Sequence, residues 1–185
     1  MLKILSFLLL FSVVSYGQTA TEIRRGNTVQ YTIYTRGSEV PLTMVIDSIT
    51  PDFVKLGWAI EGMGAGKWIM TKNALDNASR GFWDEPMEGS EHQLPDDQNV
   101  LLFSKAQVNA IKSNKPVTYD GETYTPKPLA ADQKFKLAGT ELATHYLENE
   151  SGSAKIWILD NAIFPAVVKF MGNPAGVDIE LKSIR

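Results

Sequence analysis

Short apolar runs separated by turn-forming residues fill the last third of the chain, residues 139–184, and this pattern constrains the fold most. Within residues 177–182 apolar and charged side chains alternate, which is the period of a strand buried on one face. Residues 155–159 are apolar after the first position, which predicts a strand covered on both faces. Glycine, proline and asparagine between the runs favour tight turns. We therefore predict three or four consecutive strands, within residues 140–150, 154–160, 166–171 and 175–184.

The first half of the chain repeats the strand pattern. Residues 27–36, 41–50 and 54–60 each alternate apolar and polar side chains, and their connections are short. Such runs predict an antiparallel meander, to which residues 67–71 add a fourth strand.

The strands and helices together indicate the fold class. About nine strands with one or two short helices predict a mainly β (α+β) protein, because a sheet of that size curls, closes or is covered. We expect a curved antiparallel meander sheet that forms an open or half barrel, with a helix in its mouth. A closed barrel and a two-sheet sandwich fit the same periodicity.

Two segments carry helix signals. Residues 72–79 predict one or two helical turns, with Thr71 as the N-cap. Residues 104–114 predict a longer helix that Ser104 caps. Its modest apolar stripe consists of Ala106, Val108, Ala110 and Ile111.

The segment between these helices, residues 81–99, has prolines, acids and glycine but no period. We expect a long surface loop there, of the kind that is often functional or mobile. After the second helix, Asp120-Gly121 lies between two β-rich triplets and predicts a hairpin over residues 117–125.

The N-terminus has the three parts of a signal peptide. Lys3 supplies a positive charge, residues 4–14 are almost uniformly apolar, and small residues end at Gly17. We therefore predict a signal peptide over residues 1–17 and one β-rich domain over residues 18–185, a retained anchor being the alternative. The chain has no cysteine, so we expect no lipid anchor at the cleavage site and a periplasmic or secreted protein.

The composition of the chain disfavours some classes of binding partner. The net charge of −3 is mildly acidic, which argues against nucleic acid as a partner and offers no basic membrane patch. After the signal, no apolar run approaches the length of a membrane span, so we expect no stable membrane insertion. Without cysteines, disulfides and cysteine-ligated metals are excluded.

Motifs for catalysis, cofactors and metals are weak. The glycines of residues 62–66 lack the spacing of a dinucleotide or phosphate loop, so a flexible hairpin loop is favoured. His92 and His145 have no metal-ligand spacing, and Glu88 and Glu91 lie in the aperiodic segment. Glycosidases use paired carboxylates, but the pair Asp84 and Glu85, beside Trp83, is weak evidence for that chemistry. We expect a non-enzymatic protein with no cofactor and no metal.

The most informative candidate site is apolar. Large aromatic and methionine side chains gather around the glycine-rich segment and at the start of the aperiodic one. Core packing is the favoured explanation for them, because large aromatics usually fill cores. As a site they would wall an apolar pocket at the mouth of the curved sheet. The candidate ligand-binding residues are Trp58, Met63, Trp68, Met70, Phe82 and Trp83.

Two features resemble a known kind of protein. One is the signal that ends before Gln18; the other is the tail with THY at 144–146, IWIL at 156–159, FPAVVK at 164–169 and ELKSI at 180–184. The chain resembles uncharacterised exported proteins of Bacteroidota whose fold is similar to LolA-like lipoprotein carriers. The resemblance implies a half-barrel with a greasy concave face and a helical lid, and it carries over no functional residue.

Three functions follow as hypotheses. The favoured one is a non-enzymatic periplasmic or secreted binding module for a lipophilic molecule or an acyl chain. The alternative is an interaction or assembly protein of the cell envelope that binds an envelope protein and no small molecule. A hydrolase of envelope carbohydrate is the third. A large cavity favours the first, an exposed apolar patch the second, and two facing carboxylates in a cleft the third.

Overall fold

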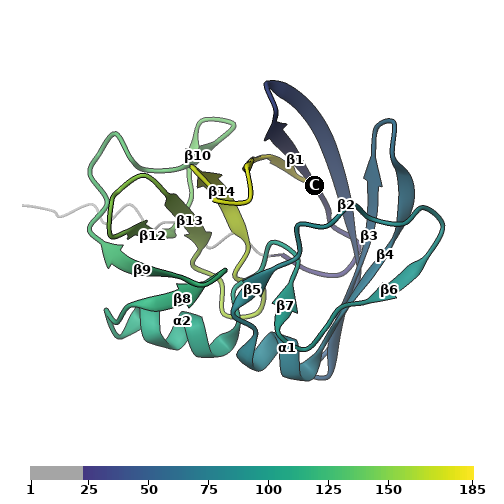
Figure 1. Ribbon diagram of the computed structural model, residues 1–185, viewed down its shortest axis with the longest axis horizontal. Helices are drawn as coiled ribbons and strands as arrows, with labels where there is room; N and C mark the ends of the chain where they lie inside the picture. Colours follow the sequence, from purple (N-terminus) through teal and green to yellow (C-terminus); the bar gives the residue numbers. More distant parts are fainter. Residues whose placement is uncertain (1–22) are drawn as a thin grey trace, which may run out of the picture.

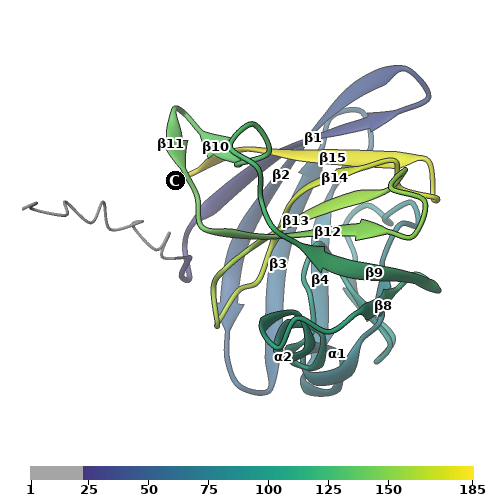
Figure 2. The same ribbon diagram turned by 90° about the vertical axis from the view of Figure 1, so that its left-hand side faces the viewer.

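The computed structural model describes residues 23–185, so the signal peptide predicted over residues 1–17 lies outside the described residues. In the described part, an eleven-stranded sheet curves around two short helices (Figures 1 and 2). The edge strands of this sheet are not hydrogen-bonded to each other, so the sheet stays open. The predicted fold class, a mainly β protein with a curved, open antiparallel sheet and short helices, is confirmed.

The first half of the sheet is an antiparallel meander of four consecutive strands. Alternating apolar residues on these strands face the concave side and are buried, which is why the sequence period is two. The strands are β1 (Thr28–Thr35), β2 (Ser38–Ile49), β3 (Phe53–Ile60) and β4 (Gly64–Thr71).

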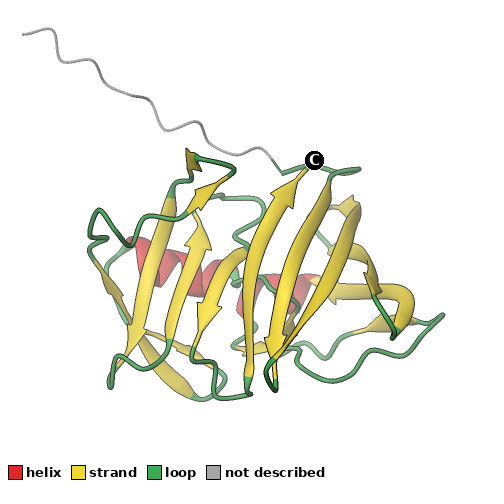
Figure 3. Cartoon of the chain, turned by 90° about the horizontal axis from the view of Figure 1, so that it is seen from above, coloured by secondary structure: helices red, strands yellow, loops and turns green. Residues whose placement is uncertain are grey.

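The second half is built from the C-terminal part of the chain. Its strands follow the order β15-β14-β13-β12-β9-β8, and β15 pairs with β1, so that the two halves form one continuous sheet (Figure 3). The strands are β8 (Val117–Tyr119), β9 (Glu122–Lys127), β12 (Thr144–Asn149), β13 (Lys155–Leu159), β14 (Val167–Met171) and β15 (Val177–Ile184).

Two helices lie on the concave side of the sheet, end to end between its two edges (Figure 3). Helix α1 (Lys72–Asn77) begins at its predicted cap, Thr71, whose side chain accepts a hydrogen bond from the Ala74 amide. Helix α2 (Lys105–Lys112) begins at Ser104, also as predicted. Within residues 23–185, neither helix combines the length and the apolarity that a bilayer span requires.

The predicted apolar stripe of α2 is wrong at one position. Ala106 is exposed, and Gln107 is buried in its place. Gln107 tolerates burial because its side chain completes the cap with Ser104 and donates to the Thr118 carbonyl at 2.8 Å. This last bond fastens α2 to the edge strand β8.

Residues 81–99 are not the structureless loop that the sequence predicts. They contain strands β6 (Glu91–Gln93) and β7 (Gln98–Asn99) and the end of strand β5 (Arg80–Gly81). Strand β6 pairs in parallel with β4 and forms one edge of the main sheet. Leu94 is buried after it, which ties the segment to the core. Strands of two or three residues are too short to produce a readable period, so the prediction missed them.

The strand predicted over residues 140–150 is divided in two. Strands β10 (Lys136–Leu137) and β11 (Thr140–Glu141) form a separate small hairpin, and β12 begins only at Thr144. Ala138 and Gly139 turn this hairpin with positive φ angles of 48° and 86°. The predicted turn at Asp120-Gly121 is confirmed, with φ angles of 52° and 80° between β8 and β9.

Candidate functional site

A row of aromatic rings crosses the concave side of the first half of the sheet. Trp58 of β3 stacks on Trp68 of β4, with ring centroids 5.4 Å apart. Trp68 meets Phe82 edge-on at 6.0 Å, and Phe82 packs against His92 of β6 at 5.6 Å. The row therefore runs from the sheet to the segment over residues 82–87, which we call the strap.

A glycine permits the innermost part of this row. Gly66 lies opposite Trp58 in the β3–β4 pair, and a Cβ at this position would lie 2.9 Å from the indole ring and 2.9 Å from the Ser90 carbonyl. Only glycine lets the Trp58 ring and the Ser90 carbonyl approach β4 this closely. The predicted flexible loop over residues 62–66 is thus wrong from Gly64 onward, where β4 begins.

The first cavity, of about 520 Å³, lies between the strap and the concave face. Strands β1, β2, β3, β4 and β15 contribute its wall, and the strap contributes its cover. Apolar side chains make up most of the lining. They are Ile33, Leu42, Ile60, Met63, Trp68, Phe82, Trp83, Pro86, Val100, Leu101, Ala175, Val177 and Ile179.

Three charged side chains reach the same cavity. Arg36 comes from the β1–β2 turn, where its φ angle is 48°, and Asp84 and Glu85 come from the strap. All three side chains are exposed, so they lie on the rim, where their charges stay hydrated. The first cavity therefore has an apolar interior and a charged entrance.

The second cavity, of about 390 Å³, lies beside the first one. It shares with the first cavity five lining residues: Trp68, Phe82, Asp84, Glu85 and Pro86. Its other walls are Trp58, Met87, Ser90, His92, Pro95 and Gln98. The strap thus covers both cavities.

The structure brings together most of the predicted ligand-binding residues. Trp58 lines the second cavity, Met63 and Trp83 line the first, and Trp68 and Phe82 line both. Met70 lines neither. It is fully buried, and its Sδ accepts a hydrogen bond from the Val100 amide at 3.3 Å, so it belongs to the core.

The sequence-based prediction missed the residues of β1, β2 and β15 that line the first cavity. Ile33, Leu42 and Ile179 lie on the concave face, and strand alternation had already placed them on an apolar face. What the alternation could not supply is the pairing of β1 with β15, which puts Ile33 opposite Ile179. Whether these residues lie near the aromatic cluster therefore depends on strand pairing between distant parts of the chain, which the sequence pattern does not indicate.

An aspartate holds the strap to the opposite edge of the sheet. The Asp120 carboxylate, in the β8–β9 turn, accepts hydrogen bonds from the Gly81 amide at 2.8 Å and from the Trp83 Nε1 at 2.7 Å. A Cβ on Gly81 would lie 2.5 Å from Trp83 Nε1 and 2.5 Å from the Tyr119 hydroxyl, so glycine is needed there. We call these three residues, Gly81, Trp83 and Asp120, the latch.

Two aspartates near the helices and a tyrosine near the latch have shifted pKa values. Hydrogen bonds from Lys105 and then Lys72 lower the pKa of Asp76, and hydrogen bonds from Thr71 and Asn73 lower that of Asp96. Burial raises the pKa of Tyr119, next to the latch, and the charge of Asp120 adds to the effect. The hydrogen bonds of Asp76 join α1 to α2, and those of Asp96 hold the start of α1.

The residues weighed as metal ligands are dispersed. The ring of His92 packs on Phe82, and Glu91 pairs with Lys55 at 3.1 Å. His145 Nε2 lies 3.3 Å from Asp160, which also pairs with Lys112. Across residues 23–185, no three His, Asp or Glu side chains are grouped so as to hold a metal ion.

The fold and the site together define a class: an open, curved β-sheet whose concave face, covered by two helices and a latched strap, encloses apolar cavities. Neither a protein family, nor a curated protein, nor a solved structure matches this chain.

Proposed function

We propose that this protein is a non-enzymatic binding module for a lipophilic molecule or an acyl chain. The observation that carries the proposal is the first cavity, which is lined mainly by apolar side chains and opens at a charged rim. Its volume of about 520 Å³ falls in the range of small-molecule sites, which are concave, mostly apolar and largely preformed. An apolar ligand would replace water there and gain about 25 cal/mol for each Å² of apolar surface buried.

The amphiphilic layout fits a molecule with one greasy end and one polar end. The interior offers Trp68, Leu42 and Ile179, whereas Arg36 and the strap carboxylates stay at the entrance. An acyl chain would lie inside, and its polar group would remain hydrated at the rim. Export directed by the predicted signal peptide would bring the protein to the periplasm or the exterior, where envelope lipids are accessible. A carrier-like role, at the level of fold, is what the resemblance to LolA-like proteins implies.

Occupancy of the cavity is the direct test. Val177 of β15 is half-buried and lines the first cavity, so Val177→Trp would fill part of it. Val45 of β2 is 37% exposed and lines neither cavity, so Val45→Trp is the matched control. We expect Val177→Trp to weaken binding of a fluorescent fatty acid at least about tenfold, because the volume for several methylenes is lost. Val45→Trp should bind as the wild type does.

Native mass spectrometry of protein purified from its own envelope complements the titration. A co-purified lipid would identify the ligand class. If folded wild-type protein binds no fatty acid or other lipophilic probe, or if both tryptophan variants bind equally well, the proposed site is wrong.

Docking of an envelope protein is the second candidate function, and a different hollow favours it. This hollow, of about 560 Å³, lies between the helices and the 160–165 segment, and Ile163 at its border is 68% exposed. Exposed apolar patches of this kind often mark protein interfaces. The same mass spectra would then contain a bound polypeptide and no lipid.

A further inference from the structure

The two cavities lie side by side and share five lining residues, of which two, Trp68 and Phe82, are aromatic. Phe82 lines both of them, and its ring lies between Trp68, at 6.0 Å, and His92, at 5.6 Å. The backbone at Phe82 is held independently, because its amide donates to the Asn99 carbonyl at 3.0 Å. The ring itself makes no hydrogen bond, so its removal alters packing and leaves the anchored strap in place.

The second cavity has an apolar side next to the first cavity and a polar side formed by Asp84, Glu85, Ser90, His92 and Gln98. Trp58, Trp68 and Phe82 give it an aromatic wall, and Met87 adds an adaptable thioether. A chain that enters between the strap and the sheet would reach this space next, if the ring of Phe82 were absent. An unbranched alkyl chain suits such a passage between aromatic rings, because it is narrow and flexible.

We propose that Phe82 sets the length of the alkyl chain that this protein accepts. The inference rests on the proposed function and names its specificity-determining residue. In the wild type the ring ends the apolar space, so the ligand tail stops in the first cavity. In Phe82→Ala the two cavities join, and the tail of a longer chain is buried in the second.

A length series of straight-chain fatty acids tests the proposal. Decanoic, tetradecanoic, octadecanoic and docosanoic acid displace a fluorescent fatty acid from wild-type protein and from Phe82→Ala. Each further buried methylene contributes about 0.8 kcal/mol, or about fourfold in Kd. We therefore expect the preference for octadecanoic over tetradecanoic acid to rise at least about tenfold in Phe82→Ala, because four more methylenes gain a place.

Two further variants control the result. Phe53 is 36% exposed on the outer face of β3 and lines neither cavity, so Phe53→Ala should keep the wild-type length profile. Phe82→Trp enlarges the barrier and should shift the preference toward shorter chains. If Phe82→Ala does not fold, Phe82→Leu and Phe82→Trp bracket the same change in size.

The outcomes separate the two proposals. Wild-type protein that binds no fatty acid of any length contradicts the proposed function. Wild-type protein that binds fatty acids, together with folded Phe82 variants whose length profiles equal that of Phe53→Ala, overturns the role of Phe82 and leaves the binding function standing.

Discussion

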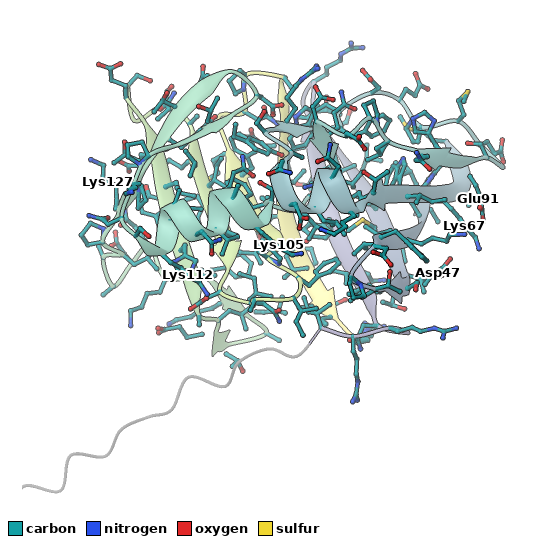
Figure 4. The ribbon with its side chains drawn as sticks, turned by 90° about the horizontal axis from the view of Figure 1, so that it is seen from below. Asp47, Lys67, Glu91, Lys105, Lys112 and Lys127 are labelled. Atoms are coloured by element: carbon teal, nitrogen blue, oxygen red, sulfur yellow. The ribbon has the colours of Figure 1, made fainter. Side chains whose placement is uncertain are left out.

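The two halves of the eleven-stranded sheet are covered to different degrees. In β13 four consecutive residues, Ile156 to Leu159, are buried, whereas in β3 buried residues alternate with more exposed ones. Residues 132–136 cover the outer face near Trp157, whose Nε1 donates to the Gln133 carbonyl at 2.7 Å. The outer face of β2 to β4 instead carries surface ion pairs, among them Lys67 with Asp47 at 3.1 Å; Figure 4 shows both side chains near Glu91.

The inner faces differ as well. Around Phe170 of β14, the rings of Tyr119, Tyr124 and Trp83 lie 6.1 Å away and fill the space. The inner face of β1 to β4 borders the two cavities. The second half is therefore packed on both faces except at β15, whereas the inner face of the first half borders cavities. Under the proposed function, ligand binding would depend on the first half and on β15 beside it, and stability mainly on the rest of the second half.

The largest expected effect is on the packed half. Trp157 is 6% exposed and packs on Tyr146 at 4.7 Å. Trp157→Ala should lower the free energy of unfolding by about 3–5 kcal/mol through lost burial and a cavity. Phe53→Ala, on the exposed outer face of the other half, should cost less than about 1 kcal/mol. Urea unfolding of both variants measures the contrast, and equal losses would show that the two halves do not differ.

An intermediate effect is expected at the latch, which joins the strap to the packed half. Asp120→Asn keeps the shape and tolerates the positive φ angle, but its amide nitrogen cannot accept the Trp83 hydrogen bond. We expect a loss of about 1.5–3 kcal/mol, as for a hydrogen bond to a charged group. Relative to the wild type, Asp120→Asn should accelerate hydrogen exchange of the strap amides more than that of the β13 amides.

Trp83→Phe completes a double-mutant cycle, because it removes the donor and keeps an aromatic ring. A coupling energy near zero between the two substitutions would mean that the strap is held by packing alone, without the carboxylate.

The smallest expected effect concerns the helices. Asp76 of α1 pairs with Lys105 of α2 at 2.6 Å and with Lys72, and these bonds lower its pKa from the ordinary 3.8. Because the folded-state pKa is the lower one, this stabilisation is present above pH 3.8 and disappears as the pH falls through the folded-state value.

The matched variant is Asp76→Asn, which lacks the charge at every pH. Its unfolding midpoint should lie below that of the wild type at pH 7 and converge with it in acid. Parallel curves over the whole acid range would show that the ion pairs between the helices contribute nothing to stability.

Much of the fold could be predicted from sequence, because alternation over five or more residues is a strong local signal. Both helix caps, Thr71 and Ser104, and the Asp120-Gly121 turn depend on neighbouring residues only, and they were confirmed. Strands β5, β6 and β7 were missed, because their pairing partners, not their own residues, define them.

The candidate site was predictable in part, for the same physical reason. Aromatic residues near one hairpin, Trp58 and Trp68, are close in sequence and in space. The wall from β15 and the Asp120 latch come from segments far along the chain, and no local pattern indicates them. Met70 shows the converse error, since the spacing that placed it in the cluster also suits a core residue.

The pairing of β1 with β15 also has a kinetic consequence. Val29 aligns with Ile184 and Thr35 with Val177, so the seam of the sheet joins residues that are far apart in sequence. Closing so long a loop costs entropy before any seam contact forms, and such contacts slow folding. Each meander can assemble from local hairpins, but until they meet, β1 and β15 are two unpaired edges. The interval before the seam closes is therefore when this chain is most open to pairing with another copy or with a chaperone.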